Sequence, residues 1–344
     1  MQKGKEITIY DIASQLNISI ATVSRALKDD PVVSNKTKKK IFETAERMGY
    51  RTNHYASSLR RQHTNTIGFM VHELQSNFIN AVLAGVEKVA TAAGYDLIIA
   101  HSQESYEREV ANAKNLFHKR VDGLITSLSF DTKTLDHFRP FTDKGVPIIF
   151  FDRVESDSDH PMVVIDNYKC GYQATRHLID QGCKKIVHVS SSLARNVYAD
   201  RFKGYRDALE HNNIPFDDSL LMIGDLSEQA GVECAEKILH MDPRPDGAFI
   251  TNDFVAAICM RTLKQHHLDI PGDIAVVGFN NDAIGQLIEP ALTTINYPGR
   301  EMGEVAARNL VNHLKGIGSI QQIDRIVINA DLIIRSSSLK GSHL

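Results

Sequence analysis

Tryptophan is absent from the sequence, cysteine occurs only four times, and no hydrophobic run is long enough to cross a membrane. A transmembrane helix needs about 20 consecutive apolar residues, so we expect no membrane span. The four cysteines lie far apart and form no C-x-x-C pair, which argues against zinc and redox motifs and favours reduced, buried thiols. Residues 1–13 contain basic side chains without a continuous apolar stretch, so no secretory signal is expected either. These absences predict a cytoplasmic protein.

The sequence also lacks the short motifs of common catalytic sites. It contains no G-x-S-x-G nucleophile elbow, no G-x-x-x-x-G-K-[ST] phosphate loop and no H-E-x-x-H zinc motif. The adjacent histidines in "QHHLD" would point to different faces of a helix and make a poor metal site. We therefore expect no enzymatic activity, no metal and no cofactor.

Positive charge is concentrated at one end of the chain. Residues 1–63 carry twelve lysines and arginines and six acidic residues. The remaining residues carry 27 lysines and arginines and 36 acidic residues. A basic segment on an acidic body is the distribution expected when only that segment meets a polyanion, although a solvated basic face would look the same. The length of 344 residues suits two or three domains.

The basic segment has the pattern of three short helices. Thr8 is placed to cap a first helix, Ser19 a second over residues 20–28, and Ser34 a third. Apolar side chains recur at helical spacing and can close one small core: Ile12, Leu16, Ile18, Val23 and Leu27, with Ile41, Phe42, Ala45 and Met48 on the third helix. Because only the tight turn "NIS" separates the first two helices, the pattern predicts a small all-α helix-turn-helix DNA-binding domain over residues 1–52.

In such domains the second helix enters the major groove of DNA with its N-terminal residues first. Arg25 has the forked group that suits guanine O6 and N7, and Ile20 and Ala21 can contact thymine methyl groups. Thr22 and Ser24 suit phosphate oxygens. The alternative is a surface helix whose hydroxyls bond only to water. The candidate DNA contacts of this domain are Thr8, Tyr10, Ser19, Ile20, Ala21, Thr22, Ser24 and Arg25.

The segment "ITIYDIASQLNISIATVSRALKDDPVVSNKTKKKIFETAERMGY" closely resembles the DNA-binding head of the LacI/GalR repressor family. The shared motifs are D-x-A, S-x-A-T-V-S-R-x-L, V-S-x-x-T and the terminal G-Y. Members of the family often carry lysine or proline, or a tyrosine–glutamine pair, at the positions of Ile20 and Ala21. This departure leaves the operator sequence open.

Residues 53–63 join the head to the rest of the chain and resemble the hinge helix of the same family. Asn53 can cap a short helix, and Ala56 and Leu59 give that helix an apolar edge. The resemblance implies that the helix forms on the operator, pairs with its twin and inserts Leu59 into the minor groove. Tyr55 is a further candidate DNA contact. The alternative is an ordinary flexible linker.

From residue 64 onward, short β-branched runs alternate with amphipathic segments. This alternation predicts parallel sheets flanked by helices, with too many units for one sheet and hence two lobes. The body, residues 64–340, is similar to periplasmic sugar-binding proteins, which implies a two-lobed α/β domain with three crossovers and a ligand cleft. We expect crossovers near residues 162–166, 290–296 and 320–325, a first lobe of residues 64–162 plus 296–320, and a second lobe of residues 163–292 plus 324–340.

In open α/β sheets, ligands lie beyond the carboxyl ends of the strands. Hydroxyl, amide, carboxylate and guanidinium groups follow the predicted strands, a mixture that suits a polyhydroxylated ligand. Family motifs in "SNFINAV", "FFDR", "DRFKGYRDAL", "TNDFVAA" and "VVGFNND" narrow the candidate effector-binding residues to Phe78, Asp152, Arg153, Arg201, Asn252 and Asn280.

Two departures from the family pattern leave the identity of the ligand open. Tyr297 stands where relatives usually have a polar amide, and Ser76 stands where they have asparagine. Each candidate also has a structural alternative: Asp152 as a helix cap, Arg201 as a surface ion-pair residue and Phe78 as part of the core.

Taken together, these patterns predict a repressor that binds a pseudo-palindromic operator as a homodimer and is controlled by a small ligand, a sugar or sugar derivative, between its lobes. The absence of a heptad repeat near residue 340 favours a dimer over a tetramer. Three alternatives stay open: control by a protein corepressor, a sugar-binding receptor without a role on DNA, and an α/β enzyme acting on a sugar. The expected location is the cytoplasm, at the nucleoid, with no membrane partner.

Overall fold

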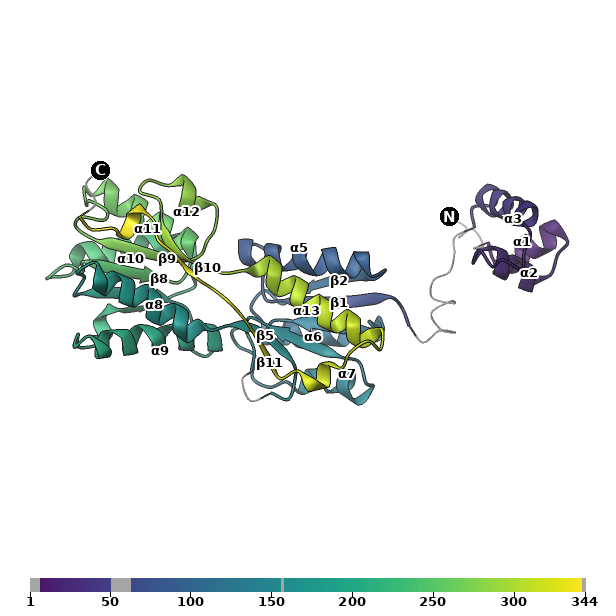
Figure 1. Ribbon diagram of the computed structural model, residues 1–344, viewed down its shortest axis with the longest axis horizontal. Helices are drawn as coiled ribbons and strands as arrows, with labels where there is room; N and C mark the ends of the chain where they lie inside the picture. The colour runs from purple at the N-terminus through teal and green to yellow at the C-terminus, as the bar shows by residue number, and fades with distance from the viewer. Residues whose placement is uncertain (1–6, 51–62, 156–157, 342–344) are drawn as a thin grey trace. The chain divides into compact units, whose positions relative to one another are not determined.

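The computed structural model describes residues 7–50, 63–155 and 158–341. The chain divides into two compact units at residue 64, and Figure 1 shows the elements of each. Among the described helices, none is both long and apolar enough to span a membrane. No group of three or more His, Cys, Asp or Glu side chains in the described ranges is arranged to hold a metal ion. The predicted hinge contacts lie outside the described residues: Asn53, Tyr55, Ala56 and Leu59.

The first unit, which we call the head, has three helices in its described residues: α1 (Ile9–Leu16), α2 (Ile20–Ala26) and α3 (Asn35–Arg47). The Ser19 hydroxyl accepts a hydrogen bond from the Thr22 backbone N–H, and the Ser34 hydroxyl accepts one from Thr37. Each of these bonds satisfies a backbone donor that the first turn of a helix leaves without a partner. Thr8 stands at the N-cap position of α1, so all three predicted cap positions, and with them the helix-turn-helix order, are confirmed.

The head encloses one small core, as the sequence predicts. It buries Ile12, Ala13, Val23, Ala26, Val33, Ile41 and Ala45, with Leu16, Ile18, Leu27 and Met48 half-buried against them. Phe42 differs from the prediction because its side chain is 47% exposed. It lies about 100° around α3 from Ile41, which takes the inward position.

The second unit, which we call the body, contains two six-stranded sheets with helices packed against them (Figure 1). The first sheet is parallel throughout and has the order β11 (Arg325–Ile328), β5 (Met162–Ile165), β4 (Ile148–Phe151), β3 (Gly123–Thr126), β1 (Thr66–Val71), β2 (Asp96–His101). The second has the order β12 (Leu332–Ile333), β10 (Thr293–Asn296), β9 (Ala275–Asn280), β8 (Gly247–Ile250), β6 (Ile186–Ser190), β7 (Leu221–Ile223), in which β12 is antiparallel to β10. The predicted two-lobed α/β architecture is confirmed.

The first lobe is built around the first sheet, and its helices are α5 (Asn77–Ala92), α6 (Tyr106–His118), α7 (Arg139–Asp143) and α13 (Gly299–Leu314). The second lobe has α8 (Asn167–Asp180), α9 (Asn196–His211), α10 (Glu228–His240), α11 (Asp253–Gln265) and α12 (Ile284–Leu287). Neighbouring strand residues pack on opposite faces of a sheet. In β4, Ile149 and Phe151 join the core under α5 and α13, whereas Ile148 and Phe150 join the core under α6 and α7. Burial on both faces accounts for the continuous apolar runs of the strands.

Three segments cross between the lobes, but two of them fall later than predicted. The crossovers lie at residue 166 after β5, at 297–298 between β10 and α13, and at 329–331 between β11 and β12. Residues 163–165 and 325–328 therefore belong to the first lobe, and their predicted place in the second lobe is wrong. β11 is an edge strand in which only Ile328 is buried, so it lacks the apolar signal of an inner strand.

Two helix pairs pack backbone against backbone because their glycines face each other. A Cβ on Gly171 of α8 would lie 2.2 Å from the carbonyl oxygen of Arg201 on α9, and a Cβ on Gly204 of α9 would lie 2.2 Å from a carbonyl oxygen of α8. Gly85 and Gly303 make the same kind of contact between α5 and α13, at 2.1 Å. A side chain at any of these positions would have to push the helices apart.

Candidate functional site

One face of α2 is exposed and carries side chains that are predicted to contact DNA. Ile20 is 39% exposed, and Ala21 and Arg25 are exposed on the same helix, while Val23 and Ala26 are buried in the core. Among the described residues, none is a hydrogen-bond partner of the Arg25 guanidinium, whose N–H groups form a fork of donors. This face can therefore meet a ligand without disturbing the core.

The hydroxyl-bearing candidates of the head also hold the helix ends in place. The Ser19 and Thr22 hydroxyl oxygens lie 2.8 Å apart, and the Thr8 hydroxyl donates to the Asp11 carboxylate at 2.6 Å. Tyr10 is 62% exposed, whereas Thr22 and Ser24 are half-buried. The caps give these hydroxyls a structural role, and their contact with DNA stays a prediction.

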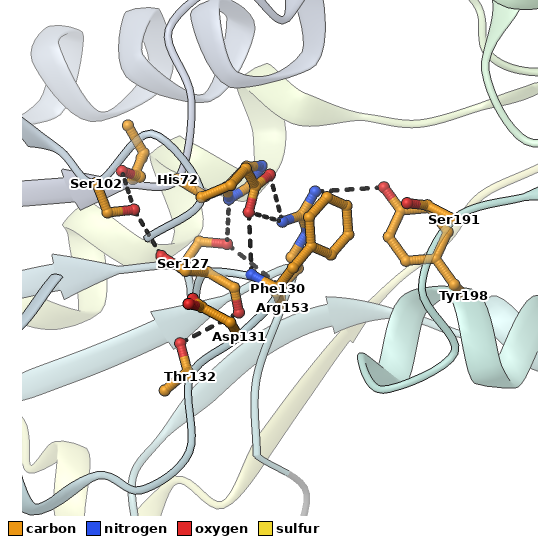
Figure 2. Close-up of polar contacts among 12 residues, drawn as sticks. His72, Ser102, Ser127, Phe130, Asp131, Thr132, Arg153, Ser191 and Tyr198 are labelled. Carbon is orange, nitrogen blue, oxygen red and sulfur yellow. Dashed lines mark hydrogen bonds and ion pairs between the residues drawn. The ribbon is translucent and has the colours of Figure 1, made fainter. Parts of the chain in front are cut away.

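In the first lobe of the body, polar side chains at the strand ends form a buried hydrogen-bonded network (Figure 2). The Ser102 hydroxyl lies 2.6 Å from that of Ser129, and the Ser127 hydroxyl lies 3.3 Å from His72 Nδ1. Burial, followed by the charge of Arg153, lowers the pKa of His72 well below its usual value, so the ring is neutral at physiological pH. The strand ends meet at one edge of the sheet, as the parallel topology requires.

A buried carboxylate fixes the loop that follows β3. Glu109, only 1% exposed, accepts the Ser129 backbone N–H at 2.8 Å and the Thr132 hydroxyl at 3.0 Å. His137 Nε2 lies 3.0 Å from the same carboxylate. The backbone of residues 129–132 is therefore held at the cleft in a defined position.

Arg153 connects the two lobes (Figure 2). Its Nη1 donates to both carboxylate oxygens of Glu104 at 2.8 and 2.9 Å, and its guanidinium carbon lies 3.9 Å from the centre of the Phe130 ring. These partners belong to the first lobe. Its Nη2 donates to the Tyr198 hydroxyl on α9 at 3.3 Å, which is a contact with the second lobe. The charge of Arg153 is thus matched by Glu104, and its remaining donor spans the cleft.

The N-terminal end of α9 makes further contacts across the cleft. Asn196 accepts the Val154 backbone N–H at 3.0 Å and donates to the Asp152 carbonyl at 3.1 Å. Arg195 Nη2 donates to the Thr132 carbonyl at 3.0 Å. Together with Arg153, these contacts hold the cleft closed by the protein's own side chains.

Asp152 lies at the end of β4 with a φ of +58° and 4% exposure. Non-glycine residues rarely adopt this conformation, and those that do cluster at functional sites. Its carboxylate accepts the hydroxyl of Tyr297, and the Tyr297 ring stacks on Phe78 with the ring centroids 4.0 Å apart. Burial raises the pKa of Asp152, against the opposing effects of Arg153 and of the Tyr297 hydrogen bond. Tyr297 therefore joins two of the predicted effector-binding residues.

Removing the Tyr297 hydroxyl should destabilise the body in a pH-dependent manner. Burial raises the pKa of Asp152 above its value in the unfolded chain. The free energy of unfolding that this carboxyl group contributes is therefore lost as the pH rises through its pKa in the folded protein. The Tyr297 hydrogen bond offsets that loss, so Tyr297→Phe should cost about 1–3 kcal/mol when Asp152 is ionised and less when it is protonated. Denaturant unfolding from about pH 4 to about pH 8 would measure this difference.

Tyr106→Phe serves as the control for this measurement, because its hydroxyl makes only a surface contact of 3.1 Å with Thr134. It should change the unfolding free energy little at any pH. A cost of Tyr297→Phe that is the same at every pH would mean that the hydroxyl does not act on the Asp152 carboxylate.

Arg201 of α9 also lies near the Tyr297 ring and is 3% exposed. Its Nε donates to Asn167 Oδ1 at 2.8 Å, and its guanidinium carbon lies 3.5 Å from the centre of the Phe279 ring and 5.3 Å from that of Tyr297. Within the described ranges it forms no ion pair with a carboxylate. The alternative in which Arg201 is a surface ion-pair residue is therefore wrong.

Asn252 has a structural role, whereas Asn280 lies beside this group. The Asn252 side chain accepts the Val255 backbone N–H at 3.1 Å and so caps α11. Asn280 ends β9 with a φ of +121° and, with Phe78 and Tyr297, lines a cavity of about 610 Å³. The structure thus brings together Phe78, Asp152, Arg153 and Arg201 through shared partners, places Asn280 at the cavity beside them, and gives Asn252 a capping role.

Five side chains of the cleft are not among the predicted site residues: Glu104, Phe130, Arg195, Asn196 and Tyr198. The amphipathic pattern of this part of the sequence predicts a helix over residues 199–212, whereas α9 begins at Asn196. The correct start would have placed Arg195, Asn196 and Tyr198 at the strand-end edge of the second lobe. Glu104 and Phe130 come from loops, and no sequence pattern points to them.

Comparisons with known proteins agree with this architecture. Residues 8–53 match the family of bacterial regulatory proteins of the lacI type, and residues 175–338 match the periplasmic binding protein-like domain. Catabolite control protein A of Priestia megaterium is 32% identical over 309 residues, which cover 90% of this chain and 92% of that protein. The solved complex of the transcriptional regulator CelR with cellobiose is 25% identical, with a TM-score of 0.71 over 96% of this chain and all 100% of that one. The lac repressor dimer bound to operator shares the fold, with a TM-score of 0.85, 23% identity and coverage of 97% of this chain and 100% of the repressor chain.

These relatives are transcriptional regulators, and the prediction that the chain is not an enzyme is confirmed by them. A regulator of this kind combines a DNA-binding helix-turn-helix with a two-lobed sensor domain, and both parts are present here. The chain is a DNA-binding transcriptional regulator and belongs to the LacI family of bacterial regulatory proteins.

Proposed function

We propose that this regulator is a repressor that binds a pseudo-palindromic operator as a homodimer and responds to a small ligand, a sugar or sugar derivative, bound between its lobes. The exposed face of α2 is the observation that carries the proposal. It presents an exposed guanidinium at Arg25 beside two apolar side chains at Ile20 and Ala21, which suit guanine and thymine edges in the major groove. The regulator would act in the cytoplasm, at the nucleoid, without a membrane partner.

Further contacts would fix the register of the head on DNA. Thr22 and Ser24 on α2, together with Ser19 at its cap, are close enough in sequence to reach neighbouring phosphates. Thr8 and Tyr10 would do the same from α1. By family resemblance, Asn53, Tyr55, Ala56 and Leu59 would form the hinge that enters the minor groove and bends the operator.

Exposed apolar side chains on the body support a homodimer. β2 and β7 are edge strands of the two sheets, and they carry Ile99 and Ile223, which are 45% and 50% exposed. In the second lobe, Phe254 and Leu287 are also exposed, by 41% and 84%. Open edge strands with large apolar side chains invite association, and a second copy related by a two-fold axis would cover the same surface on both chains.

The cleft has the groups that a sugar-like effector needs. Phe78 and Tyr297 offer aromatic faces, while Asp152, Arg153 and Arg201 offer charged hydrogen-bonding groups, and Asn280 lies at the adjoining cavity. Asn252 would take part only after leaving its cap on α11. The similarity to CelR, which was solved with cellobiose, supports a carbohydrate.

Ligand binding would alter the contacts of Arg153 and Asn196, and therefore the relative rotation of the lobes. A coupling free energy of about 1–3 kcal/mol is enough to change operator affinity between five- and a hundredfold.

A protein corepressor is the second candidate for control, and one observation favours it. Arg153 and Asn196 already close the cleft through contacts with the opposite lobe. A body that closes on its own side chains is open to control by a partner on its outer surface.

A selection experiment on genomic fragments tests the proposal. Full-length protein is incubated with sheared genomic DNA and excess bulk competitor at moderate ionic strength, with and without a metabolite extract, and the bound fragments are sequenced. We expect an enriched inverted repeat whose half-sites lie about one helical turn apart. Light scattering on the same protein should give the mass of a dimer.

The results distinguish the candidates. A change in operator affinity on adding metabolites alone supports the small ligand, whereas a change that requires a protein fraction supports the corepressor. The proposal fails if no fragment is enriched under any of these conditions.

A further inference from the structure

Carboxylates at the strand ends accept hydrogen bonds from the protein itself. Both oxygens of Glu104 accept Arg153, and Asp152 accepts a tyrosine hydroxyl. Asp253, at the start of α11, accepts a threonine hydroxyl and a backbone N–H, each at 2.7 Å. Each of these carboxylates therefore has a hydrogen-bond donor within the chain.

In contrast, some buried N–H donors among the described residues have no acceptor, most clearly those of Arg195. This side chain is 7% exposed, and of its three guanidinium nitrogens only Nη2 has an acceptor, the Thr132 carbonyl. Nε and Nη1 are buried without a hydrogen-bond partner among the described residues. Glu155 Oε2 lies 3.8 Å from Nη1, too far for a hydrogen bond, and its side chain is 55% exposed.

A second buried guanidinium lies on the same helix. Within the described part of the chain, Arg201 donates one hydrogen bond, from Nε to the amide oxygen of Asn167, and it packs on the Phe279 ring. Both arginines stand in or before the first two turns of α9, a helix of 16 residues whose N-terminal end carries partial positive charge. Buried guanidinium N–H groups without an acceptor are unfavourable, and the half-exposed Glu155 carboxylate, 3.8 Å away, offers Arg195 an ion pair but no hydrogen bond.

We propose that the effector carries an anionic group, a phosphate or a carboxylate, and that Arg195 binds it at the start of α9 with Arg201 adding positive charge. This inference rests on the proposed small-ligand control of the cleft and specifies its chemistry. The oxygens of such a group would accept the two buried N–H donors of Arg195 that have no partner. The half-exposed Glu155 side chain would turn away into solvent, and the lobes would part and close again on the bound group.

Calorimetric unfolding of the full-length protein tests the proposal. The probes are glucose, glucose 6-phosphate, gluconate and inorganic phosphate, with ionic strength matched by sodium chloride. A ligand at ten times its dissociation constant should raise the unfolding midpoint of the body by about 2–4 °C. We expect at least one of the three anions to do so and glucose not to. The phosphate and gluconate arms show which of the two anionic groups the site takes.

Variants of two arginines on α9 provide the matched comparison. Arg195→Gln should abolish the shift produced by the anion, and Arg195→Lys, which keeps the charge, should restore part of it. Arg206→Gln removes the same charge from an exposed position of the same helix and should leave the shift unchanged. Far-ultraviolet circular dichroism without ligand should be the same for all three variants and the wild type, which shows that each variant is folded.

The outcomes separate this inference from the proposed function. Equal stabilisation by glucose and by its charged derivatives, a shift that survives Arg195→Gln, or no shift with any anion would overturn the anionic effector while operator binding still supports the repressor. Loss of operator binding by the wild-type protein itself would instead count against the proposed function.

Discussion

Alanine in place of Gly171 should lower the free energy of unfolding of the body by about 3 kcal/mol or more. The new Cβ would lie 2.2 Å from the carbonyl oxygen and 2.8 Å from the Cα of Arg201. These are backbone atoms of a long helix, which cannot rotate away as the tip of a side chain can, so α8 and α9 would have to separate. The direction of this change in unfolding free energy is informative, because alanine normally stabilises a helix by about 1 kcal/mol relative to glycine. Denaturant unfolding followed by circular dichroism gives the difference.

Gly224→Ala is the matched control in the same lobe. Its nearest heavy atom to a built Cβ is 3.8 Å away, an ordinary van der Waals contact. The unfolding free energy of this variant should stay within about 0.5 kcal/mol of the wild type. If Gly171→Ala were as stable as this control, the close packing of α8 on α9 would be ruled out.

Arg25→Ala should remove most of the preference for operator over unrelated DNA. Its exposed guanidinium has no partner within the described head, so its donors are available to a guanine, and such a bidentate contact discriminates by about 1–3 kcal/mol. Weak binding through the lysines of the head should persist and should fall steeply with salt. Titrations of operator and scrambled duplexes at several salt concentrations measure both quantities.

Arg47→Ala removes the same charge from the exposed end of α3, away from the α2 face. It should weaken binding to both duplexes by a similar factor and leave their ratio unchanged. An Arg25→Ala protein that keeps the wild-type ratio would show that Arg25 does not read bases.

The architecture of the head was predictable because its signals are local. A serine before each of α2 and α3 and an apolar residue every three or four positions specify the helices and their inward faces. Phe42 was misplaced because periodicity defines an apolar stripe only to within one neighbouring position, and packing then selects Ile41.

The inner strands of the body were equally readable, since burial on both faces gives continuous apolar runs. The lobe boundaries could not be predicted from the sequence, because β11 is a half-exposed edge strand whose partner β5 lies about 160 residues away in sequence. Its pairing is a tertiary contact that no local pattern records.

The candidate site also contains some features that the sequence predicts and others that it does not. Asp152 and Asn280 were found because strand ends are readable, and their positive φ values were not part of that signal. The contact of Tyr297 with Asp152 joins the second crossover to the end of β4, so its effect on the cleft could only be seen in the folded chain. Arg195 was missed because the start of α9 was placed too late.

The facing glycines of α8 and α9 have a consequence for how the body can transmit motion. With no side chain between Gly171 and the backbone of Arg201, any displacement of α9 must carry α8 along with it. α8 starts at Asn167, directly after the segment that leaves β5, and the Asn167 amide also holds Arg201. A displacement of α9 is therefore passed to α8, and so to the crossover at residue 166, by direct contact between helix backbones that cannot yield by side-chain rotation.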